Sequence, residues 1–426
     1  MVDSLLLEPG EWTSPAAVGV GELPRHRWYF VKEGFSPFFV SQVLQTEEVL
    51  PGELLMDPFS GGGTVPLVGV MAGVRVETCE VNPFLHFLST AKLLTADAGE
   101  LLRSGEIVLR TMEQPVTSPL EGVSTFTEGN RWGRWLFPLS AIRAFEAGRR
   151  ALLLVQDGRC RALLKLALIG AAMDACNATR DGKCLRFRPG WRDREATAGQ
   201  VRARFEARFR EMGVDIDRPP LRGVAARLIR GDAREKIGAS KEKFRLCITS
   251  PPYLNSFDYS DVYRPELFLG DFVASTNDLM KIRLRTIRSH VQAKWEMPTR
   301  SDFGALYRKC IDDLGGVSDR LWDKRLLLMI QAYFEDMAGV LARLRARASR
   351  SASLWLVVST SAYGGVEVPV DGILAEMGQQ EGWFLRELEV VRYLRSSSQH
   401  VENGQSGKRA VRLRESLLVF DACETR

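Results

Sequence analysis

Five consecutive residues carry the clearest chemical signal in the sequence: Thr249-Ser250-Pro251-Pro252-Tyr253. They follow a mostly apolar run, 244–248, whose last three residues predict a short buried strand. Each proline lacks an N–H and fixes φ, so the pair ends the strand and holds the backbone extended. The carbonyl groups of Ser250 and Pro251 are then free to accept hydrogen bonds beside the ring of Tyr253. Acceptors next to a flat aromatic surface suit a planar base that carries an exocyclic amine.

A glycine-rich turn lies between two predicted strands upstream. Residues 53–57 predict a strand, 58–64 the turn, 65–72 a helix and 74–80 a second strand. Glycines let the backbone approach a ligand closely, and a helix N-terminus is electropositive. Glu80 ends the second strand, 23 residues after Asp57, where a carboxylate could bind a ribose diol.

Other ligands fit this turn less well. It lacks the Gly-Lys-Ser/Thr run of a phosphate-binding P-loop, and Pro66 stands where a dinucleotide fingerprint needs a third glycine. A bare structural turn is the remaining alternative. The spacing of Asp57, the glycines and Glu80, followed by Asn82-Pro83, favours a nucleoside ligand instead.

The alternation of strands and turns resumes near Asp232. Residues 228–231 predict a strand, and Asp232 at its end could receive an adenine amino group, cap the helix that starts at Ala233, or do both. Later stretches continue the same pattern: helices at 324–347 and 370–381, and strands at 354–358, 384–395 and 417–420. These strands are the elements that must bring the two motifs together.

Positive charge is concentrated in one part of the chain. Residues 131–230 contain 22 Arg or Lys and 10 Asp or Glu, a net charge of +12, whereas the whole chain carries only +5. This part is mostly helical by its apolar spacing, and it includes a basic, aromatic-containing loop, 180–192. A solvated charged face is the plain interpretation. In an enzyme that holds nucleic acid, the same loop would contact phosphates.

Composition limits the remaining possibilities. The seven cysteines are scattered without a C-x-x-C pair, and the four histidines form no ligand cluster, so we expect reduced thiols, a cytoplasmic setting and no metal. The acidic N-terminus has too short an apolar part for a signal peptide. No apolar run approaches the length of a membrane span, so we expect no membrane partner.

Three segments together resemble one family, the S-adenosylmethionine-dependent DNA amino-methyltransferases. Residues 57–64 are similar to the cofactor loop of that family, and 28–37 to the segment that precedes it. Residues 249–253 are similar to its catalytic motif, in the Ser-Pro-Pro-Tyr form typical of N4-cytosine enzymes. Methylation at cytosine C5 would need a nucleophilic cysteine, usually after proline, and the chain has no Pro-Cys pair.

The resemblance covers residues 25–95 and 225–270 well, and 325–421 as a pattern of strands and helices, where 395–399 and Glu415-Ser416 are similar to late family segments. The cofactor half precedes the catalytic motif, unlike the subgroup in which the catalytic half leads. This order leaves the place of target recognition open.

By the resemblance, S-adenosylmethionine would contact twelve residues: Phe35, Ser36, Asp57, Pro58, Phe59, Gly61, Gly63, Thr64, Glu80, Asn82, Asp232 and Ala233. The catalytic group would be Thr249, Ser250, Pro251, Pro252 and Tyr253, with Tyr253 stacked on a base flipped out of the duplex. We add five candidate DNA contacts from the basic loop: Arg180, Lys183, Arg186, Arg188 and Arg192.

We therefore expect an α/β fold: a doubly wound, Rossmann-like methyltransferase sheet with a large helical insertion. The expected division is an arm and cofactor half (1–96), a basic helical insertion (97–225), a catalytic half (226–270), a second insertion (271–325) and the rest of the sheet (326–426). Either insertion could read the target.

The expected partner is double-stranded DNA, with a cognate restriction endonuclease as a further candidate. We expect a monomer or weak dimer. N6-adenine methylation, RNA base methylation and a catalytically inactive binding subunit stay open as alternatives.

Overall fold

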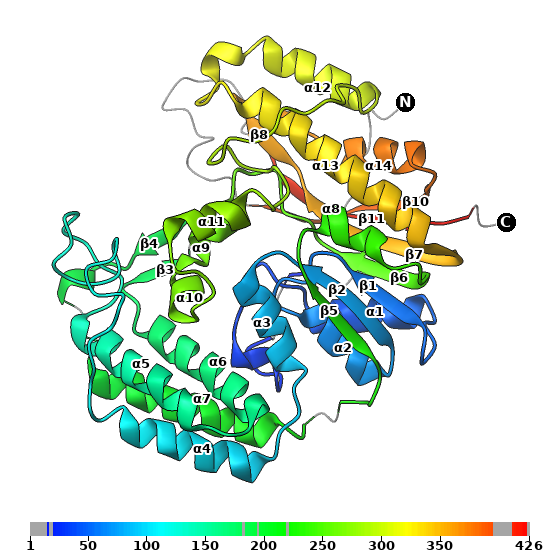
Figure 1. Ribbon diagram of the computed structural model, residues 1–426. Coiled ribbons are helices and arrows are strands. Elements are labelled where there is room, and N and C mark those ends of the chain that lie inside the picture. The colour runs from blue at the N-terminus through cyan, green and yellow to red at the C-terminus, as the bar shows by residue number, and fades with distance from the viewer. Residues whose placement is uncertain are drawn as a thin grey trace.

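The protein is described from a computed structural model. The structure describes residues 15–16, 20–180, 184–193, 196–218, 221–394 and 411–423. Its centre is a seven-stranded sheet of order β5-β2-β1-β6-β7-β11-β10 (Figure 1). The strands are β1 (Leu54–Asp57), β2 (Arg75–Glu80), β5 (Ala226–Arg230), β6 (Phe244–Thr249), β7 (Ala348–Ser359), β10 (Phe384–Tyr393) and β11 (Arg414–Asp421).

Five neighbouring strands of this sheet run parallel. β1 pairs in parallel with β2 and with β6, β2 pairs in parallel with β5, and β6 with β7. β11 is antiparallel to both of its neighbours, β7 and β10. The doubly wound sheet predicted from the sequence is confirmed.

Each strand sends alternate residues to two apolar layers, as the two-residue period of a strand requires. Leu55, Ile248 and Val357 face one layer, which contains helices α1 (Pro37–Thr46) and α2 (Thr64–Ala72). The opposite residues, such as Met56 and Cys247, face the second layer. That layer contains α8 (Ala233–Lys236), η4 (Ile237–Ala239), α13 (Leu326–Arg347) and α14 (Val370–Gln380). The sheet is therefore buried on both faces, as parallel sheets are.

A helical lobe is inserted between β2 and β5 and lies apart from the sheet (Figure 1). Helix α3 (Pro83–Lys92) joins the two, because Phe84, Leu85 and Leu88 belong to the apolar core of the lobe. The lobe consists of α4 (Ala98–Thr111), α5 (Leu139–Ala151), η2 (Leu152–Leu154), α6 (Gly158–Asp174), β3 (Ala178–Arg180), β4 (Leu185–Phe187), η3 (Trp191–Asp193) and α7 (Ala198–Asp215). The lobe is mostly helical, as the apolar spacing of this part of the chain predicted.

The N-terminal segment fastens this lobe to the sheet. It contains η1 (His26–Trp28), and its side chains converge on Asp215 at the end of α7. Arg27 donates two hydrogen bonds to the Asp215 carboxylate, at 2.9 and 2.6 Å, and Trp28 Nε1 donates a third at 3.0 Å.

Two short strand pairs lie outside the sheet. The basic loop predicted at 180–192 is in part an antiparallel hairpin, β3–β4, with Thr179 opposite Arg186. The second pair is β8 (Ser361–Tyr363) with β9 (Val366–Val368). Neither was predicted, because three-residue strands leave no readable alternation.

The stretch after β6 is a chain of short helices: α9 (Tyr259–Val262), α10 (Arg264–Leu269), α11 (Thr276–Arg283), α12 (Ala305–Gly315) and η5 (Ser318–Arg320). In Figure 1, α9 to α11 lie between the sheet and the helical lobe, whereas α12 lies beside α13. None of the described helices is long and apolar enough to cross a bilayer.

Candidate active site

A cavity of about 310 Å³ lies where the carboxyl ends of β1, β2, β5 and β6 meet. Its wall contains residues from both motifs: Pro58, Phe59, Gly61, Glu80 and Asn82 from the first half, and Ser250, Pro251, Pro252 and Tyr253 from the second. Phe35, Asp232 and Ala233 line it as well. The parallel topology explains this meeting, since ligands bind at the carboxyl ends of such strands.

The remaining predicted residues stand just behind this wall. Asp57 and Thr249 end neighbouring strands, and Thr249 Oγ1 donates to Asp57 Oδ1 at 2.8 Å. The same oxygen accepts from the Phe59 N–H at 3.1 Å, which fixes the start of the glycine turn. Burial raises the pKa of Asp57 to about 7, although the hydrogen bonds from Thr249 and Phe59 oppose the rise. Asp57 and Thr249 thus tie the two motifs together.

The glycine turn is shaped by its two positive-φ glycines and by close packing. Gly61 and Gly63 have φ of 47° and 78°. A Cβ atom at Gly63 would lie 2.8 Å from Ser89 of α3, so only glycine lets α2 begin there. Thr64 follows as the first residue of α2 and is buried, as is Ser36 at the N-cap of α1.

Glu80 holds the turn from the end of β2. Its carboxylate accepts from the Gly61 N–H at 2.9 Å and from the Asn82 N–H at 2.8 Å. Burial raises the pKa of Glu80 to about 7, and the hydrogen bonds from Asn82 and Gly61 act in the opposite direction. Asn82 caps α3 through its side-chain oxygen, while its Nδ2 is buried with no hydrogen-bond partner in the described chain.

A buried lysine supports the turn from behind. Lys92 of α3 donates from Nζ to the Gly62 carbonyl at 2.9 Å. The side chain is almost fully buried, and burial lowers its pKa to about 7. The sequence offered no signal for this contact, because a lysine near a helix end usually faces water.

These features fit a nucleoside cofactor. The unpartnered Asn82 Nδ2 lines the cavity, the Glu80 carboxylate lies beside it, and the glycine turn brings backbone close to both. Asp232 also lines the cavity, but its two oxygens already accept hydrogen bonds from Arg234. The carboxylate also caps α8 by accepting from the Arg234 N–H at 2.9 Å, so the predicted capping role is confirmed.

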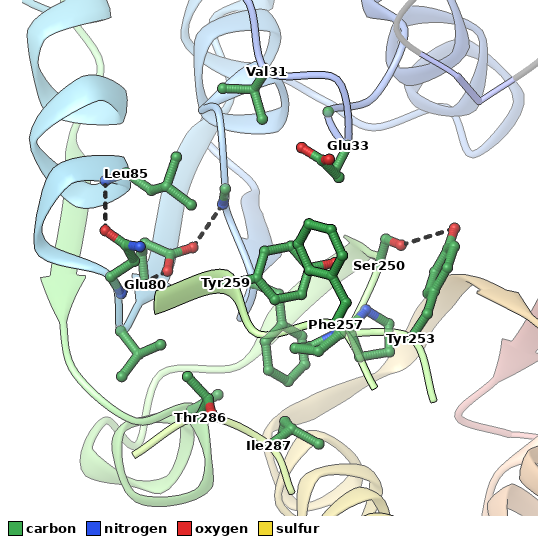
Figure 2. A pocket seen from close by; sticks show the side chains of 18 of the residues that line it. Val31, Glu33, Glu80, Leu85, Ser250, Tyr253, Phe257, Tyr259, Thr286 and Ile287 are labelled. Carbon is green, nitrogen blue, oxygen red and sulfur yellow. Dashed lines mark hydrogen bonds between the residues drawn. The ribbon is translucent and has the colours of Figure 1, made fainter. Parts of the chain in front are cut away.

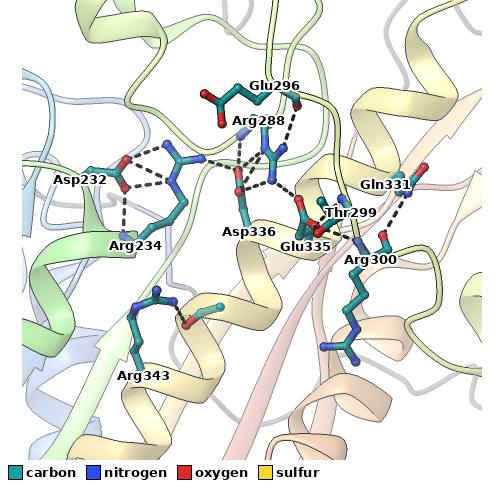
Figure 3. Close-up of polar contacts among 11 residues, drawn as sticks. Asp232, Arg234, Arg288, Glu296, Thr299, Arg300, Gln331, Glu335, Asp336 and Arg343 are labelled. Carbon is teal, nitrogen blue, oxygen red and sulfur yellow. Dashed lines mark hydrogen bonds and ion pairs between the residues drawn. The ribbon is translucent and has the colours of Figure 1, made fainter.

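Asp232 begins a series of ion pairs that reaches the other side of the cavity (Figure 3). Arg234 bridges Asp232 to Asp336 of α13, at 3.0 Å from the latter. Asp336 also pairs with Arg288 at 2.7 Å. The three residues that precede Arg288 line the cavity: Arg285, Thr286 and Ile287. The predicted second insertion therefore supplies part of the wall.

The segment Ser250–Tyr253 is anchored by β11 and β10, the two strands at the end of the sheet opposite β5. Tyr253 Oη donates to Glu415 of β11 at 2.8 Å, and Arg392 of β10 pairs with the same carboxylate at 2.7 Å. Ser250 Oγ lies 3.5 Å from Tyr253 Oη. Burial raises the pKa of Tyr253 well above its usual range, so the phenol stays protonated. Sequence similarity marked Glu415, but nothing in the sequence paired it with Tyr253.

Two further aromatic rings stand in the cavity. Phe257 and Tyr259 follow the motif, their ring centroids are 4.3 Å apart, and Figure 2 shows them between Glu80 and the Ser250–Tyr253 side. Their loop is held by Asp258, which pairs with Arg283 of α11 at 2.6 Å. We did not assign these rings from the sequence, although the aromatic stretch after the motif was visible.

The candidate DNA contacts lie outside this cavity. Arg180 is largely buried, where it pairs with Glu266 and stacks 4.4 Å over the ring of Tyr263. Arg186 and Arg192 are exposed, and Arg188 donates to the Cys176 carbonyl at 3.1 Å. Lys183 lies outside the described residues.

Most of the sequence is similar to two Type II methyltransferases. It is 23% identical over 418 residues to M.AvaI of Nostoc sp. (strain PCC 7120 / SAG 25.82 / UTEX 2576), which covers 91% of this chain and 85% of the relative. It is 20% identical over 453 residues to M.BsoBI of Geobacillus stearothermophilus, which covers 93% and 85%. No family model matches the sequence.

Two solved structures overlap weakly with this chain. TrmN from Thermus thermophilus has a TM-score of 0.29 and 9% identity, over 91% of this chain and 49% of that one. The rRNA methyltransferase AviRa from Streptomyces viridochromogenes has a TM-score of 0.29 and 11% identity, over 91% and 85%. At TM-scores this low, neither structure indicates a function for this chain.

The similarity to the two Type II enzymes spans both motifs and most of each chain. It confirms the resemblance to the methyltransferase family that the motifs predicted. It also implies S-adenosylmethionine as the methyl donor.

Proposed function

Since the chain is a relative of the Type II methyltransferases, we propose that it methylates the exocyclic N4 of cytosine in duplex DNA, within a restriction-modification or related protective system. One observation carries the proposal: a single cavity is lined by the glycine turn with Glu80 on one side and by Ser250 to Tyr253 on the other. A methyl donor and an amine acceptor can therefore meet in one space.

The cofactor side is assigned by the chemistry of its residues. S-adenosylmethionine, when bound, supplies the electrophilic methyl group of a sulfonium. Glu80 and Asn82 would bind its polar groups, and the backbone of Gly61 would approach it closely. Asp57 positions this turn, because its carboxylate accepts a hydrogen bond from the Phe59 N–H. Glu80 is assigned to the ribose and Asp232 to the adenine.

The amine side is assigned to the rigid motif. The nitrogen lone pair of a cytosine amine is delocalised into the ring, so the amine is a weak nucleophile. The Ser250 hydroxyl and the Pro251 carbonyl would accept its hydrogen bonds and draw the nitrogen toward a tetrahedral geometry. Such alignment can lower a barrier by roughly 7–11 kcal/mol when both reactants are held in place.

The target base must leave the duplex to reach Ser250 and Pro251 in the cavity wall. Flipping costs a few kcal/mol, and stacking on an aromatic ring returns roughly 1–3 kcal/mol. Tyr253, Phe257 and Tyr259 supply such rings within the cavity wall. The Glu415 carboxylate holds the Tyr253 hydroxyl, which fixes the plane that a base would stack on.

The test is methyl transfer to unmodified DNA made by polymerase chain reaction. Purified protein with tritiated S-adenosylmethionine should label this duplex, and mass spectrometry of the hydrolysed nucleosides should find N4-methylcytosine. Ser250→Ala and Tyr253→Ala should abolish most labelling yet leave cofactor affinity, measured by calorimetry, near that of the wild type.

Other outcomes assign other functions. N6-methyladenine would replace the proposed base, since both targets are exocyclic amines that the same acceptors could hold. Labelling of RNA alone, or cofactor and DNA binding without transfer, would overturn the proposal in favour of an RNA enzyme or an inactive subunit. Sequencing that detects modified bases, applied to DNA from a host expressing the gene, would then give the recognition sequence.

A further inference from the structure

Two segments distant in sequence form one surface on the helical lobe. The first is the loop 127–135, and the second is the hairpin β3–β4 with η3. Asn177, just before β3, donates from its N–H to the Leu136 carbonyl at 2.7 Å. The rings of Trp135 and Trp191 then meet edge to face, with centroids 4.7 Å apart. Loop and hairpin are therefore one packed unit.

The loop itself is held in a fixed shape by Asn130. Its Nδ2 donates to the carbonyls of Thr127 and Arg134, at 2.6 and 2.8 Å. Its Oδ1 accepts from the Trp132 N–H at 2.9 Å. Trp132 is nevertheless 46% exposed. A large aromatic side chain is thus presented to solvent on a loop held by its own hydrogen bonds, an arrangement more typical of binding surfaces than of cores.

Arginines surround these rings without carboxylate partners. Arg131 lies 4.4 Å over the Trp132 ring, and Arg192 lies 4.6 Å over the Trp191 ring. Arg134 lies 6.0 Å over the ring of Phe187. Within the described part of the chain, none of the three comes within 4 Å of a carboxylate oxygen, whereas most buried carboxylates elsewhere hold an arginine. Stacking orients a guanidinium and leaves its N–H edge available to a phosphate.

Two carboxylates of the described residues lie near this group in the sequence. Glu128 accepts from the Leu139 N–H at 2.7 Å, at the start of α5. Asp193 is exposed beside Arg192. We call the set the arginine–tryptophan surface: Arg131, Trp132, Arg134, Trp191 and Arg192.

The surface is continuous with the wall of the cavity. β3 begins at Ala178, opposite Phe187, and ends at Arg180, which stacks over Tyr263. Tyr263 lines the cavity. A three-residue strand spans only about 10 Å. In Figure 1 the hairpin lies beside α9 and α10, which stand between it and the sheet. Through Arg180 and Tyr263, the hairpin is thus in contact with a residue of the cavity wall.

We propose that the arginine–tryptophan surface binds backbone phosphates of duplex DNA that flank the base in the cavity. This inference rests on the proposed function. Arg131, Arg134 and Arg192 each donate to a phosphate, and Trp132 packs against the adjoining sugar and backbone. Phosphate contacts position a duplex without reading its sequence. The surface therefore contributes affinity and register for any DNA, and the identity of the target is read elsewhere.

The experiment compares two triple variants of the full chain. Arg131→Ala/Arg134→Ala/Arg192→Ala removes three charges from the surface. Lys241→Ala/Arg343→Ala/Arg350→Ala removes three exposed charges near the amino ends of β6 and β7, at the opposite edge of the sheet. Binding of a fluorescein-labelled duplex is measured by anisotropy over a range of salt concentrations, with S-adenosylhomocysteine present. Tritium transfer gives KM and kcat for the same proteins.

The slope of log K against log salt is negative, and its magnitude should decrease by about 0.9 for every phosphate that the variant no longer binds. Kd at fixed salt should rise by tenfold or more. KM for DNA should rise in parallel with little change in kcat. The control triple variant should match the wild type. Binding should also quench Trp132 fluorescence, as a Trp132→Phe variant would establish by difference.

The outcomes that contradict the proposal are separable. A surface variant that keeps the wild-type salt slope and KM, while the wild type methylates DNA, overturns the surface alone. A wild type that neither binds nor methylates DNA overturns both this inference and the proposed function. If the surface variant binds polyglutamate less tightly than the wild type but binds DNA equally well, the surface holds an acidic protein, and the inference is overturned.

Discussion

The rigid motif at Ser250 to Tyr253 depends on a residue far away in the chain. The Glu415 carboxylate accepts a hydrogen bond from the Tyr253 hydroxyl at 2.8 Å. It also forms an ion pair with Arg392, the residue directly opposite it on β10. Tyr253 is thereby fixed at both ends, by Pro252 along the backbone and by Glu415 at the ring tip. An aromatic ring held in this way can stack on a base without first losing rotational freedom.

We predict that Glu415→Ala lowers kcat by roughly 10–100-fold, because a misplaced ring no longer aligns the base with the donor. Single-turnover tritium transfer measures the effect. Tyr253→Phe is the matched variant, since it keeps the ring and removes only the hydroxyl. If Glu415 acts through that hydroxyl, the double variant should be no slower than Glu415→Ala. Fully additive losses would contradict the positioning role.

A second prediction concerns the buried Glu80. Its pKa is raised to about 7 by burial, so between pH 4.5 and 7 the folded state binds more protons than the unfolded state. Stability from this group is fully present below the unfolded pKa and is lost as pH rises through 7. The loss should be on the order of 3 kcal/mol.

Glu80→Gln should remove this part of the pH dependence while keeping an acceptor for the Gly61 N–H. Urea unfolding followed by circular dichroism from pH 4.5 to 7.5 provides the measurement. Asp57 has a pKa raised in the same direction, so the variant should flatten the profile without abolishing the slope. A variant whose slope equals that of the wild type would refute the assignment.

At the scale of elements, the glycine turn illustrates how packing selects a residue. Gly63 has φ of 78°, and a Cβ there would lie 2.8 Å from Ser89 of α3. Gly52 has φ of 87°, but a Cβ there would meet nothing within 4 Å. The two positions therefore share the backbone strain and differ in the steric contact.

Gly52→Ala should reduce the free energy of unfolding by about 1–2 kcal/mol, from the left-handed backbone alone. Gly63→Ala should cost about 1–3 kcal/mol more, from the contact with α3, and should also weaken cofactor binding. Urea unfolding and calorimetry give the two readouts. An equal loss of unfolding free energy in both variants would mean that α3 moves to make room for the Cβ atom, and would contradict a steric role for Gly63.

The elements were predictable where apolar periodicity was long. β6 and α13 carry sustained patterns, and their positions agree with the sequence analysis within a few residues. The strand predicted at 354–358 is longer in the structure, where β7 begins at Ala348. The hairpin β3–β4 was missed because its strands are short, basic and half-exposed. Its two strands are held by contacts with the loop before α5, which no local pattern encodes.

The candidate site divides in the same way. Residues on the motifs and at strand ends were predictable, since parallel strands place their carboxyl ends at one edge. The contacts that hold these residues in place were not predictable. They are the hydrogen bonds of Lys92 with Gly62 and of Tyr253 with Glu415, and the ion pair of Arg283 with Asp258. Each joins residues that only the tertiary fold brings together, so their chemistry is visible in the sequence but their partners are not.

At the scale of the whole molecule, one buried carboxylate ties the N-terminal segment to the helical lobe. Asp215 accepts hydrogen bonds from Arg27 and Trp28, and its carboxylate is almost fully buried. Glu211, one turn earlier on α7, lies 3.6 Å from Arg27 but is partly exposed. The two carboxylates offer a matched comparison of a buried and a solvated contact.

Asp215→Ala should reduce the free energy of unfolding by about 3–5 kcal/mol, because it leaves buried donors without an acceptor. Glu211→Ala should cost less than about 1 kcal/mol. Hydrogen exchange should show faster opening of α7 in the first variant and not in the second. Similar exchange in both variants would mean that apolar packing alone holds the lobe.

Arg25 links the two ends of the lobe. Its buried guanidinium donates to the Lys92 and Leu94 carbonyls, at 2.9 and 2.8 Å, and also to the Ile216 carbonyl. Leu94 precedes the lobe and Ile216 ends it, so one side chain spans both ends of an insertion more than a hundred residues long. Loop-closure entropy depends only weakly on the length between fixed ends. A change in the length of the lobe should therefore add little to the entropy cost of closing it, and β2 and β5 can keep their places as long as Arg25 holds the two ends together.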